Sequence, residues 1–498
     1  MPDRVDYRFR NGWVDTGDLP CREALLASLP LRQVARPDGP FDMIHPGLDG
    51  RDVDYSTFRH RPTLVRRGFR TRLHASEGGT ARFALETCGA VYLWLGDELV
   101  AGFEPCERNT RNSTEVSFDI PAGSHDLTLL MEDLHERDTL AFFSLVYLDG
   151  PTLEADPPGF PAGALQDAIA CLDGLRPDQV FYTSGAVSLV AGHAPSVPVT
   201  VSTTVSAFSR GGLATDPADR IRRELTLSAD TLSASVFTMD GSRAGCQALD
   251  LSLEIGGARL SRQLGLTLLP KAKSLKGPLD QRKSRAADLI AAGSGFEPSV
   301  AALLALRGEQ PDRVARILDE TLITIEERYD CSDFSILPLL RLWRDARDNL
   351  DPVRQARLRA ALLSYRYWLD EPGDDVMWFW SENHVLCFHT AQMIAGGLFP
   401  DEVFSNSGKT GRQHRAQAEA RLEQWFASID AHGLCEWNSA AYYPIDLLAL
   451  FTLHDMEPSL APLAAKVMDR IFVMAGLHTS GGVPAGSQGR CYEKELLS

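Results

Sequence analysis

The sequence predicts a multidomain protein of the α+β class, in which two β-sandwiches are followed by an (α/α) toroid. Three observations lead to this prediction. The chain has 498 residues, more than one hydrophobic core normally serves. Apolar and polar residues alternate in short runs over most of 69–270, and beyond 276 apolar residues recur at helical spacing. We therefore expect domains at 1–155, 163–272 and 277–498.

The first domain is expected to be a jelly-roll-like β-sandwich. Runs such as ARFALETCG, STEVSFDI and LAFFSLVYLDG are bounded by Gly, Asp, Asn and Pro, which is typical of antiparallel strands joined by tight turns. In YLWLGDELVAG, Gly96 and Asp97 tolerate a positive φ angle and predict a hairpin. The stretch resembles the jelly-roll domains found beside glycosidase catalytic domains, and this resemblance implies an accessory, carbohydrate-binding-like role.

A second sandwich-like unit is expected after the Pro-rich linker at 149–163 and a short amphipathic helix, ALQDAIACLDGL. Alternation returns in VTVSTTVSAF, RRELTLSA and ALDLSLEI. This unit contains no cluster of catalytic residue types in its sequence. The side chains suited to chemistry therefore belong to the helical domain.

The helical domain is expected to be a toroid of antiparallel hairpins. Apolar residues recur at i, i+3 and i+4 in segments such as PDRVARILDETLITIEERYD and LAPLAAKVMDRIFVMAGL. A helical solenoid is the alternative, but the segments show no fixed repeat period. The chain stops at GVPAGSQGRCYEKELLS, directly after a Gly/Ser-rich loop, and our hypothesis is that the toroid is incomplete.

Composition argues against several kinds of partner. The formal net charge of -17 disfavours nucleic acid, because phosphate binding needs concentrated Lys and Arg. The N-terminus lacks the apolar core of a secretory signal and no segment has the length of a membrane span, so we expect a cytoplasmic protein that has no membrane partner. The sequence has no CxxC, no HExxH and no Asp-rich calcium loop, so we expect neither a metal nor another cofactor. Oligomeric state does not follow from these residues.

The densest group of reactive side chains is DDVMWFWSENHVLCFHT, beginning at residue 374. Trp378 and Trp380 are suited to stack on the apolar faces of sugar rings, although core packing is the alternative for either one. The SENH motif precedes an expected helix at 385–398, whose N-terminus favours anionic ligands. His389 follows one turn later, and we expect it to contact substrate.

A second group, HGLCEWNSAAYYPID, precedes an expected helix at 440–454. Asn438 and Tyr442 are candidate substrate contacts. Because each motif opens a helix and one helical hairpin separates them, the two loops can meet at one end of a toroid. SQGRCY contributes Arg490 and Tyr492 to a further loop, with Arg490 suited to bind a carboxylate. The SGKTG segment at 407–411 is interpreted as a loop that closes over the site.

The motifs W.WSENH, SGKTG and EWNSAAYYPIDLLALFTL resemble a family of bacterial and fungal toroid proteins linked to polysaccharide degradation. More remotely, the Asn-His and Tyr constellation is similar to polysaccharide lyases with an (α/α) toroid. The resemblance implies that Asn383 binds a uronate carboxylate, that His384 neutralises it or acts as general base, and that Tyr443 transfers the proton. It implies a lyase that cleaves uronate-containing oligosaccharides by β-elimination.

Two alternatives remain. Glycoside hydrolysis needs two carboxylates, and Glu382 and Glu436 supply them, with Asp374, Asp375 and Asp446 in reserve. The other alternative is a carbohydrate-binding protein that catalyses no reaction.

Overall fold

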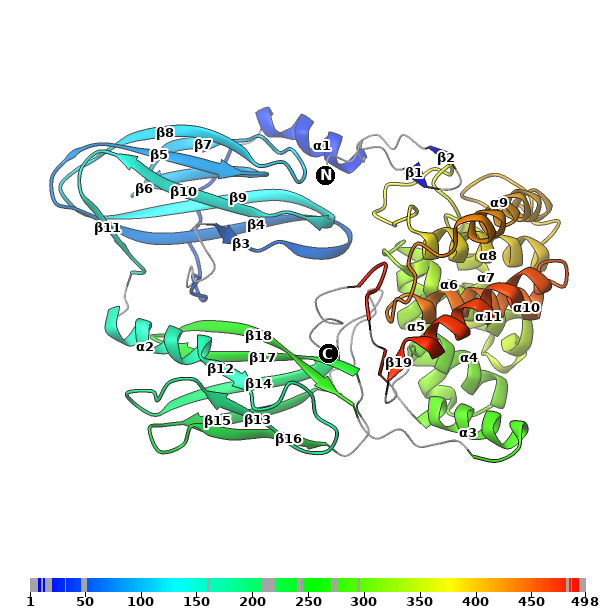
Figure 1. The fold of residues 1–498 in the computed structure, drawn as a ribbon. Helices are drawn as coiled ribbons and strands as arrows, with labels where there is room; N and C mark the ends of the chain where they lie inside the picture. Colours follow the sequence, from blue (N-terminus) through cyan, green and yellow to red (C-terminus); the bar gives the residue numbers. More distant parts are fainter. Residues whose placement is uncertain are drawn as a thin grey trace.

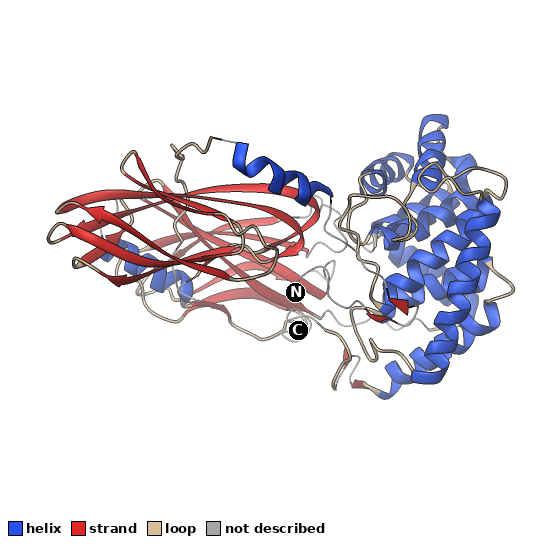
Figure 2. Cartoon of the chain, turned by 90° about the horizontal axis from the view of Figure 1, so that it is seen from above, coloured by secondary structure: helices blue, strands red, loops and turns tan. Residues whose placement is uncertain are grey.

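We describe the protein from a computed structural model that covers residues 8–9, 12–13, 20–31, 33–45, 52–158, 162–207, 220–239, 243, 245–269, 276–292, 296–480, 483–484 and 486–491. The strands gather in two groups and the long helices gather in a third (Figure 1). Seen from above, the sheets and the helical part lie at opposite ends of the molecule (Figure 2).

The first group of strands forms two antiparallel sheets that share one core, in the orders β3-β10-β5-β8 and β11-β4-β9-β6-β7. Alternate residues of β5 (Ala81, Phe83 and Leu85) are buried, as the period-two pattern predicts. The predicted hairpin joins β6 to β7, and Gly96 has a φ of +60°. The strands are β3 (Val53–Asp54), β4 (Thr57–Ala75), β5 (Gly79–Thr87), β6 (Ala90–Leu95), β7 (Glu98–Phe103), β8 (Asn112–Ile120), β9 (Gly123–Thr139), β10 (Phe142–Asp149) and β11 (Leu153–Asp156).

The second group also forms two antiparallel sheets, in the orders β12-β13-β16 and β15-β14-β17-β18. The predicted linker helix is α2 (Ala162–Asp173), whose Leu165, Ala168 and Leu172 pack into the core of this group. The strands are β12 (Leu175–Pro177), β13 (Gly185–Ala191), β14 (Val199–Ala207), β15 (Ile221–Leu227), β16 (Ser233–Met239), β17 (Gly245–Ile255) and β18 (Ala258–Leu268).

The helices alternate between two layers. The helices α4, α6, α8 and α10 pack successively on one another, while α5, α9 and α11 pack against α4, α8 and α10 respectively. The helices are α3 (Leu279–Ala292), α4 (Glu297–Arg307), α5 (Pro311–Glu326), α6 (Ser332–Ala346), α7 (Pro352–Ser364), α8 (Glu382–Leu398), α9 (Gly411–His432), α10 (Tyr443–Met456) and α11 (Ala461–Leu477). Closure of this array into a toroid stays a prediction, as do the domain limits.

The elements outside these three groups are short. They are β1 (Arg8–Phe9), β2 (Gly12–Trp13), α1 (Pro20–Ser28), η1 (Leu29–Leu31), η3 (Arg347–Asn349), β19 (Thr479–Ser480) and β20 (Val483–Pro484).

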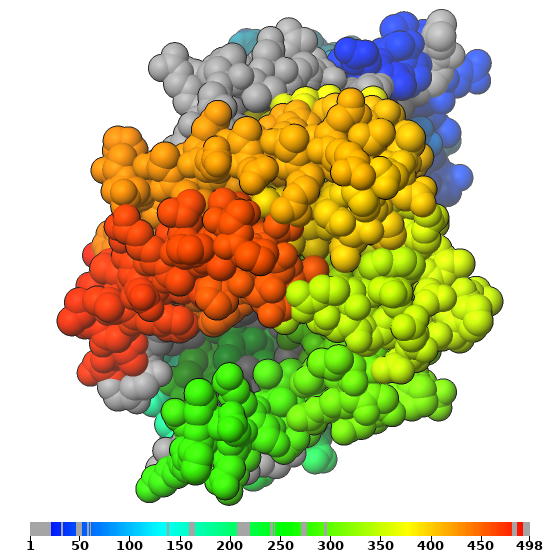
Figure 3. Space-filling view, turned by 90° about the vertical axis from the view of Figure 1, so that its right-hand side faces the viewer, coloured from blue at the N-terminus to red at the C-terminus, as the bar shows by residue number. Residues whose placement is uncertain are grey.

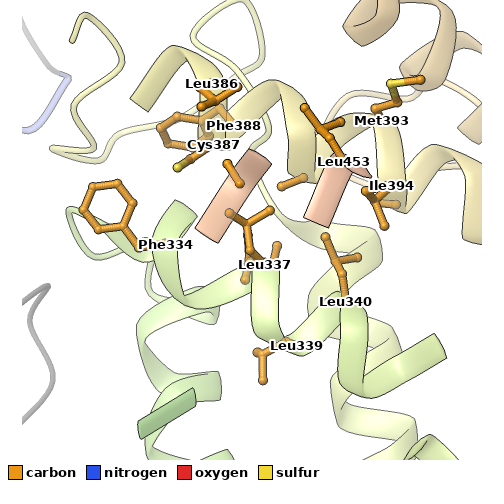
Figure 4. Close-up of a cluster of buried hydrophobic side chains, with 14 of the residues drawn as sticks. Phe334, Leu337, Leu339, Leu340, Leu386, Cys387, Phe388, Met393, Ile394 and Leu453 are labelled. Carbon is orange, nitrogen blue, oxygen red and sulfur yellow. The ribbon is translucent and has the colours of Figure 1, made fainter. Parts of the chain in front are cut away.

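The core of the helical part lies between α6, α8 and α10. Figure 4 shows part of this core, with Phe334, Leu337 and Leu340 from α6 and Leu386 and Phe388 from α8. Every residue of α8 from 383 to 396 is buried, so this helix is enclosed on all sides. Figure 3 shows the outer surface of the helical part, with α3 and α4 in green at the foot and α10 and α11 in orange and red.

Two helix starts differ from the predicted ones. The α8 helix begins at Glu382 rather than at 385, because Ser381 is the last extended residue, so Glu382, Asn383 and His384 lie in the first helical turn and Ser381 is its N-cap. The α10 helix begins at Tyr443 rather than at 440. The cause is a turn at 436–442, in which Asn438 has a φ of +53°.

The N-terminal part of the chain touches the helical part through Arg61 on β4 and Cys21 on α1. The Arg61 guanidinium pairs with the Glu327 carboxylate and lies over the Tyr329 ring. The backbone N–H of Cys21 on α1 donates to Asp374 Oδ1 at 3.3 Å. Among the described residues, no single helix is long and apolar enough to cross a membrane, although the bent pair α3 and α4 together meets that test by length and composition.

Candidate active site

The SENH and EWNSAAYY motifs meet through reciprocal hydrogen bonds. The backbone N–H groups of Cys435 and Glu436 donate to the Glu382 carboxylate at 2.9 and 3.2 Å. In return, the backbone N–H and the side-chain amide of Asn383 donate to the two oxygens of Glu436, both at 3.2 Å. Glu382 and Glu436, which come from two distant segments, are therefore brought to the same turn.

The start of α8 explains why the carboxylates gather here. Unpaired N–H groups and the helix dipole favour negative charge at a helix N-terminus. Glu382 and Asn383 occupy that first turn, and Asn383 uses its own N–H on Glu436. The indole N–H of Trp425 on α9 donates to the backbone oxygen of Glu382 at 3.1 Å, which fixes the turn against the next helix.

The segment 486–491 lies against the second motif. Arg490 Nη1 lies 2.8 Å from Glu436 Oε1, and its guanidinium lies over the Tyr442 ring at 4.4 Å from the centroid. The Ser439 hydroxyl donates to the Arg490 backbone oxygen at 2.7 Å. Tyr492, the other predicted contact in this segment, lies outside the described residues.

Tyr443 and Asn438 hold the turn before α10. The Asn438 backbone N–H donates to the Tyr443 hydroxyl at 2.6 Å, and the Asn438 side-chain amide donates to Ser487 O at 3.0 Å. The left-handed backbone of Asn438 is one that Asn tolerates better than most residues. Tyr443 is 7% exposed, and burial raises the pKa of its hydroxyl. In this structure both side chains stabilise the turn.

Asp446, in the first turn of α10, is a third carboxylate near the two glutamates. It is fully buried, and neither of its carboxylate oxygens has a hydrogen-bond partner among the described residues. Burial, and then the negative charges of Glu436 and Glu382, raise the pKa of Asp446 well above its ordinary value. It is therefore a carboxylic acid that keeps its proton at a pH where ordinary aspartates have lost theirs.

His384 faces a different neighbour from Asn383. Its Nδ1 lies 2.8 Å from Asp333 Oδ2, and its ring stacks on Phe334 of α6 at 4.7 Å between centroids. The sequence suggested that Asn383 and His384 lie together beside one ligand. Because both belong to a helix, where consecutive residues do not face the same side, Asn383 points to Glu436 and His384 points to α6.

His389 lies in the core rather than at the site. It is fully buried, and its ring centroid is 4.1 Å from that of Trp368. Burial lowers its pKa well below 6.5. The expected contact with substrate is therefore not available in this structure, because α8 is enclosed on every side at this turn.

Three tryptophans lie in the segments around the carboxylates. Trp378 and Trp380 form an edge-to-face pair with centroids 4.9 Å apart, and both are partly exposed. The Trp378 backbone N–H donates to Asp330 Oδ1 at 2.8 Å, which fixes the loop before α8. Trp437, inside the second motif, is 36% exposed. These rings are the apolar surface that a sugar ring would need.

The SGKTG segment does not close over this site. A Cβ atom on Gly396, in the last turns of α8, would lie 2.5 Å from the backbone oxygen of Gly411, so the segment 407–411 runs beside the far end of that helix. Lys409 Nζ donates there to Gln417 Oε1 at 2.9 Å. The interpretation as a lid is corrected for this reason.

From the sequence alone, Asp333 was not expected at the site, and Asp446 was considered only a reserve carboxylate for hydrolysis. Asp446 stands in the first turn of an expected helix, where an acidic residue is ordinary. Asp333 lies 51 positions before His384, and only the packing of α6 on α8 brings them together. Among the described residues, no group of three or more His, Cys, Asp or Glu side chains is arranged to hold a metal ion.

Comparison with known proteins leaves the family open. No family model matches the chain, and no curated protein is similar to it in sequence. Solved structures similar to it include a GH78 family rhamnosidase of Bacillus sp. GL1 (11% identity over 82% of this chain and 58% of that chain, TM-score 0.24). A family 76 glycoside hydrolase from a Bacteroides thetaiotaomicron strain gives 8% identity over 60% and 76%, with a TM-score of 0.21. A Bacteroides uniformis β-glucuronidase gives 12% over 58% and 39%, with a TM-score of 0.15.

These neighbours are carbohydrate-active enzymes of the glycoside hydrolase type. The chain spans 58% of the length of the rhamnosidase. At such low TM-scores the similarity carries no argument about activity, so the function has to be argued from the site.

Proposed function

We propose that this protein acts on carbohydrate and hydrolyses a glycosidic bond with Glu382 and Glu436 as the carboxylate pair. The observation that carries the proposal is the reciprocal contact of the two motifs, which brings these two glutamates to one turn. Hydrolysis of a glycosidic bond needs two carboxyl groups at the reacting carbon, one to give a proton and one to take a proton or attack.

The surroundings of the glutamates suggest a division of roles. Glu436 forms an ion pair with Arg490 and is suited to the charged role of base or nucleophile. Glu382 is partly exposed and is assigned the proton transfer to the leaving oxygen. The bond between the anomeric carbon and that oxygen breaks, and water supplies a hydroxyl to the carbon while its remaining proton goes to the carboxylate pair.

Two further features support a carbohydrate substrate. Trp378 and Trp380, which are partly exposed, and Trp437, which is 36% exposed, offer ring surface in the two segments that carry the carboxylates. Asp446 supplies a buried carboxylic acid near the pair, and burial together with the charges of Glu436 and Glu382 raises its pKa well above the ordinary value.

A second candidate is β-elimination at a uronate, as the sequence resemblance implies. The contact between His384 and Asp333 favours it, because a carboxylate on Nδ1 orients an imidazole for use as a base. It fits less well than hydrolysis, since Asn383 is fully buried and already donates its side-chain amide to Glu436. In this arrangement that amide is not available to a uronate carboxylate.

The proposal is tested with the variants E382Q and E436Q on two substrates. A glycoside with a good leaving group needs no protonation, so E382Q should keep most of its activity on para-nitrophenyl glycosides and lose it on oligosaccharides. E436Q should lose activity on both. The matched control is D374N, which changes an exposed aspartate in the loop before the site and should leave the activity unchanged. Equal activity of E382Q, E436Q and the unmodified protein would refute the assignment.

A further inference from the structure

A second group of reactive side chains lies around the start of α9, beside the far end of α8 from the glutamate pair. The Ser407 hydroxyl lies 2.7 Å from His414 Nε2. Ser407 is partly exposed in the loop between α8 and α9, whereas His414, in the first turn of α9, is fully buried. A serine hydroxyl in direct contact with an imidazole is the first requirement of a nucleophilic site.

The other ring nitrogen of His414 faces one amide nitrogen, Gln392 Nε2, and one carboxylate oxygen, Glu371 Oε1. Its Nδ1 lies 3.9 Å from Glu371 Oε1 and 3.0 Å from the Gln392 side-chain amide. Glu371 Oε1 and Gln392 Oε1 are both buried and have no hydrogen-bond partner among the described residues. A half-turn of the Gln392 amide would exchange its Nε2 for Oε1 against the ring and give up the 3.5 Å contact of that Nε2 with Gln417 Oε1. Nδ1–H would then be the donor, and the other ring nitrogen of His414, Nε2, would accept the serine proton.

The loop fixes Ser407 in this position. The Lys409 backbone N–H donates to the Ser407 hydroxyl oxygen at 3.2 Å, and the Gly408 N–H donates to Phe404 O at 2.8 Å. Gly408 has a φ of +70°, which makes the turn tight. Phe404 packs on the His414 ring with centroids 4.4 Å apart. Ser407 and His414 are therefore held in a fixed relative position, the first by the loop and the second by α9.

Charges around the serine favour a neutral imidazole and a developing negative charge. Burial, and then the Lys409 ammonium, lower the pKa of His414 to about 4, so the ring is uncharged near neutral pH. The Lys409 backbone N–H, which donates to the Ser407 hydroxyl oxygen at 3.2 Å, would favour negative charge on that oxygen. The exposed surroundings are polar, with Lys409 Nζ between Gln417 at 2.9 Å and Asp370 at 3.6 Å.

We propose that Ser407, His414 and Glu371 form a second site that cleaves O-acyl esters, with Ser407 as nucleophile and His414 as base. The Ser407 oxygen attacks the acyl carbon while its proton passes to His414 Nε2. The ester C–O bond breaks and the alcohol leaves with that proton. Water then adds to the acyl-serine and releases the acid, which restores the hydroxyl. The polar surroundings favour a hydroxyl-rich alcohol such as an acylated sugar. Glu371 is a positioning residue, because it acts through His414.

The alternative is that these contacts only fasten the loop to α9. Covalent labelling distinguishes a nucleophilic Ser407 from this structural role. The full-length protein is treated with a fluorophosphonate probe, and the modified peptide is identified by mass spectrometry. The expected adduct lies on Ser407, is absent from S407A and is retained by S405A, which changes an exposed serine two residues earlier in the same loop. The labelling rate should be nearly constant between about pH 6 and 8, because His414 stays neutral in that range.

Further variants keep the outcome decisive. H414F preserves an aromatic ring in the packed position and should lower the labelling rate at least about tenfold, and E371Q should lower it less. Absence of an adduct on Ser407 in the folded protein, or equal labelling of unmodified protein and H414F, would overturn the proposal.

Discussion

Asn383 donates both its backbone N–H and its side-chain amide to the carboxylate of Glu436, each at 3.2 Å, across 53 positions of sequence. Because Asn383 opens α8 and Glu436 lies in the turn before α10, this contact determines how the two helix starts meet. The arrangement of Glu382, Arg490 and Asp446 around them depends on it.

Replacing Asn383 should therefore destabilise the protein. In N383A, the buried Glu436 carboxylate loses its side-chain amide partner, and we expect the free energy of unfolding to fall by about 1–3 kcal/mol. Denaturant unfolding followed by circular dichroism measures this change. The control is S381A, which removes the hydroxyl that donates to Asn383 Oδ1 at a partly exposed position and should cost less. A larger fall in the free energy of unfolding in S381A than in N383A would contradict this expectation.

Changing Arg490 should affect activity more than stability. Its side chain is 29% exposed, so the ion pair with Glu436 is expected to contribute no more than about 1 kcal/mol to folding. In R490M, Glu436 loses its cation and the Tyr442 ring loses the guanidinium, and kcat should fall. R490K keeps the charge without the planar group, so its kcat should lie between those of the unmodified protein and R490M. Thermal melting and glycosidase kinetics on the three proteins test this, and an inactive but equally stable R490M agrees with the account.

Asp446 gives the stability a predictable dependence on pH. Its folded-state pKa lies above its ordinary value of 3.8, so the folded protein holds a proton that the unfolded chain releases. Its contribution to stability therefore falls as pH rises from about 4 through the folded-state pKa. Relative to the unmodified protein, D446N should gain about 1.4 kcal/mol of stability per pH unit within that window. Unfolding measured at several pH values tests the slope, and a pH-independent difference would contradict it.

His389 should not contribute to substrate binding. In H389F a phenyl ring replaces the imidazole against Trp368, so the core keeps its shape and the free energy of unfolding should change by less than about 1.5 kcal/mol. KM on the best glycoside should be unchanged. A large increase in KM at unchanged stability would place His389 in the site after all.

The fold was largely predictable because period-two and helical patterns report directly which faces are buried. The β5 strand and α5 follow their patterns closely, and Gly96 makes the turn expected of it. Helix starts were less predictable. The α8 helix takes in Glu382, Asn383 and His384 because Ser381 ends the extended loop, and none of these three residue types forbids a helix.

The convergence of the two motifs could be predicted, but the directions of their side chains could not. Asn383 and His384 were expected side by side, and the helix sends them to Glu436 and Asp333. The contact between His384 and Asp333 depends on the packing of two helices, which no local pattern encodes. The contact between Ser407 and His414 could not be predicted either, because it depends on the turn at Gly408.

The most direct test of the central claim is the chemistry of the product. Purified protein is incubated in heavy-oxygen water with a panel of neutral and uronate-containing oligosaccharides, and fresh products are analysed by mass spectrometry and ultraviolet absorbance. Hydrolysis through Glu382 and Glu436 predicts products that carry one heavy oxygen atom at the new reducing end and show no new absorbance, and E436Q should form none. Products that gain absorbance from a new double bond and carry no heavy oxygen would contradict hydrolysis and show β-elimination.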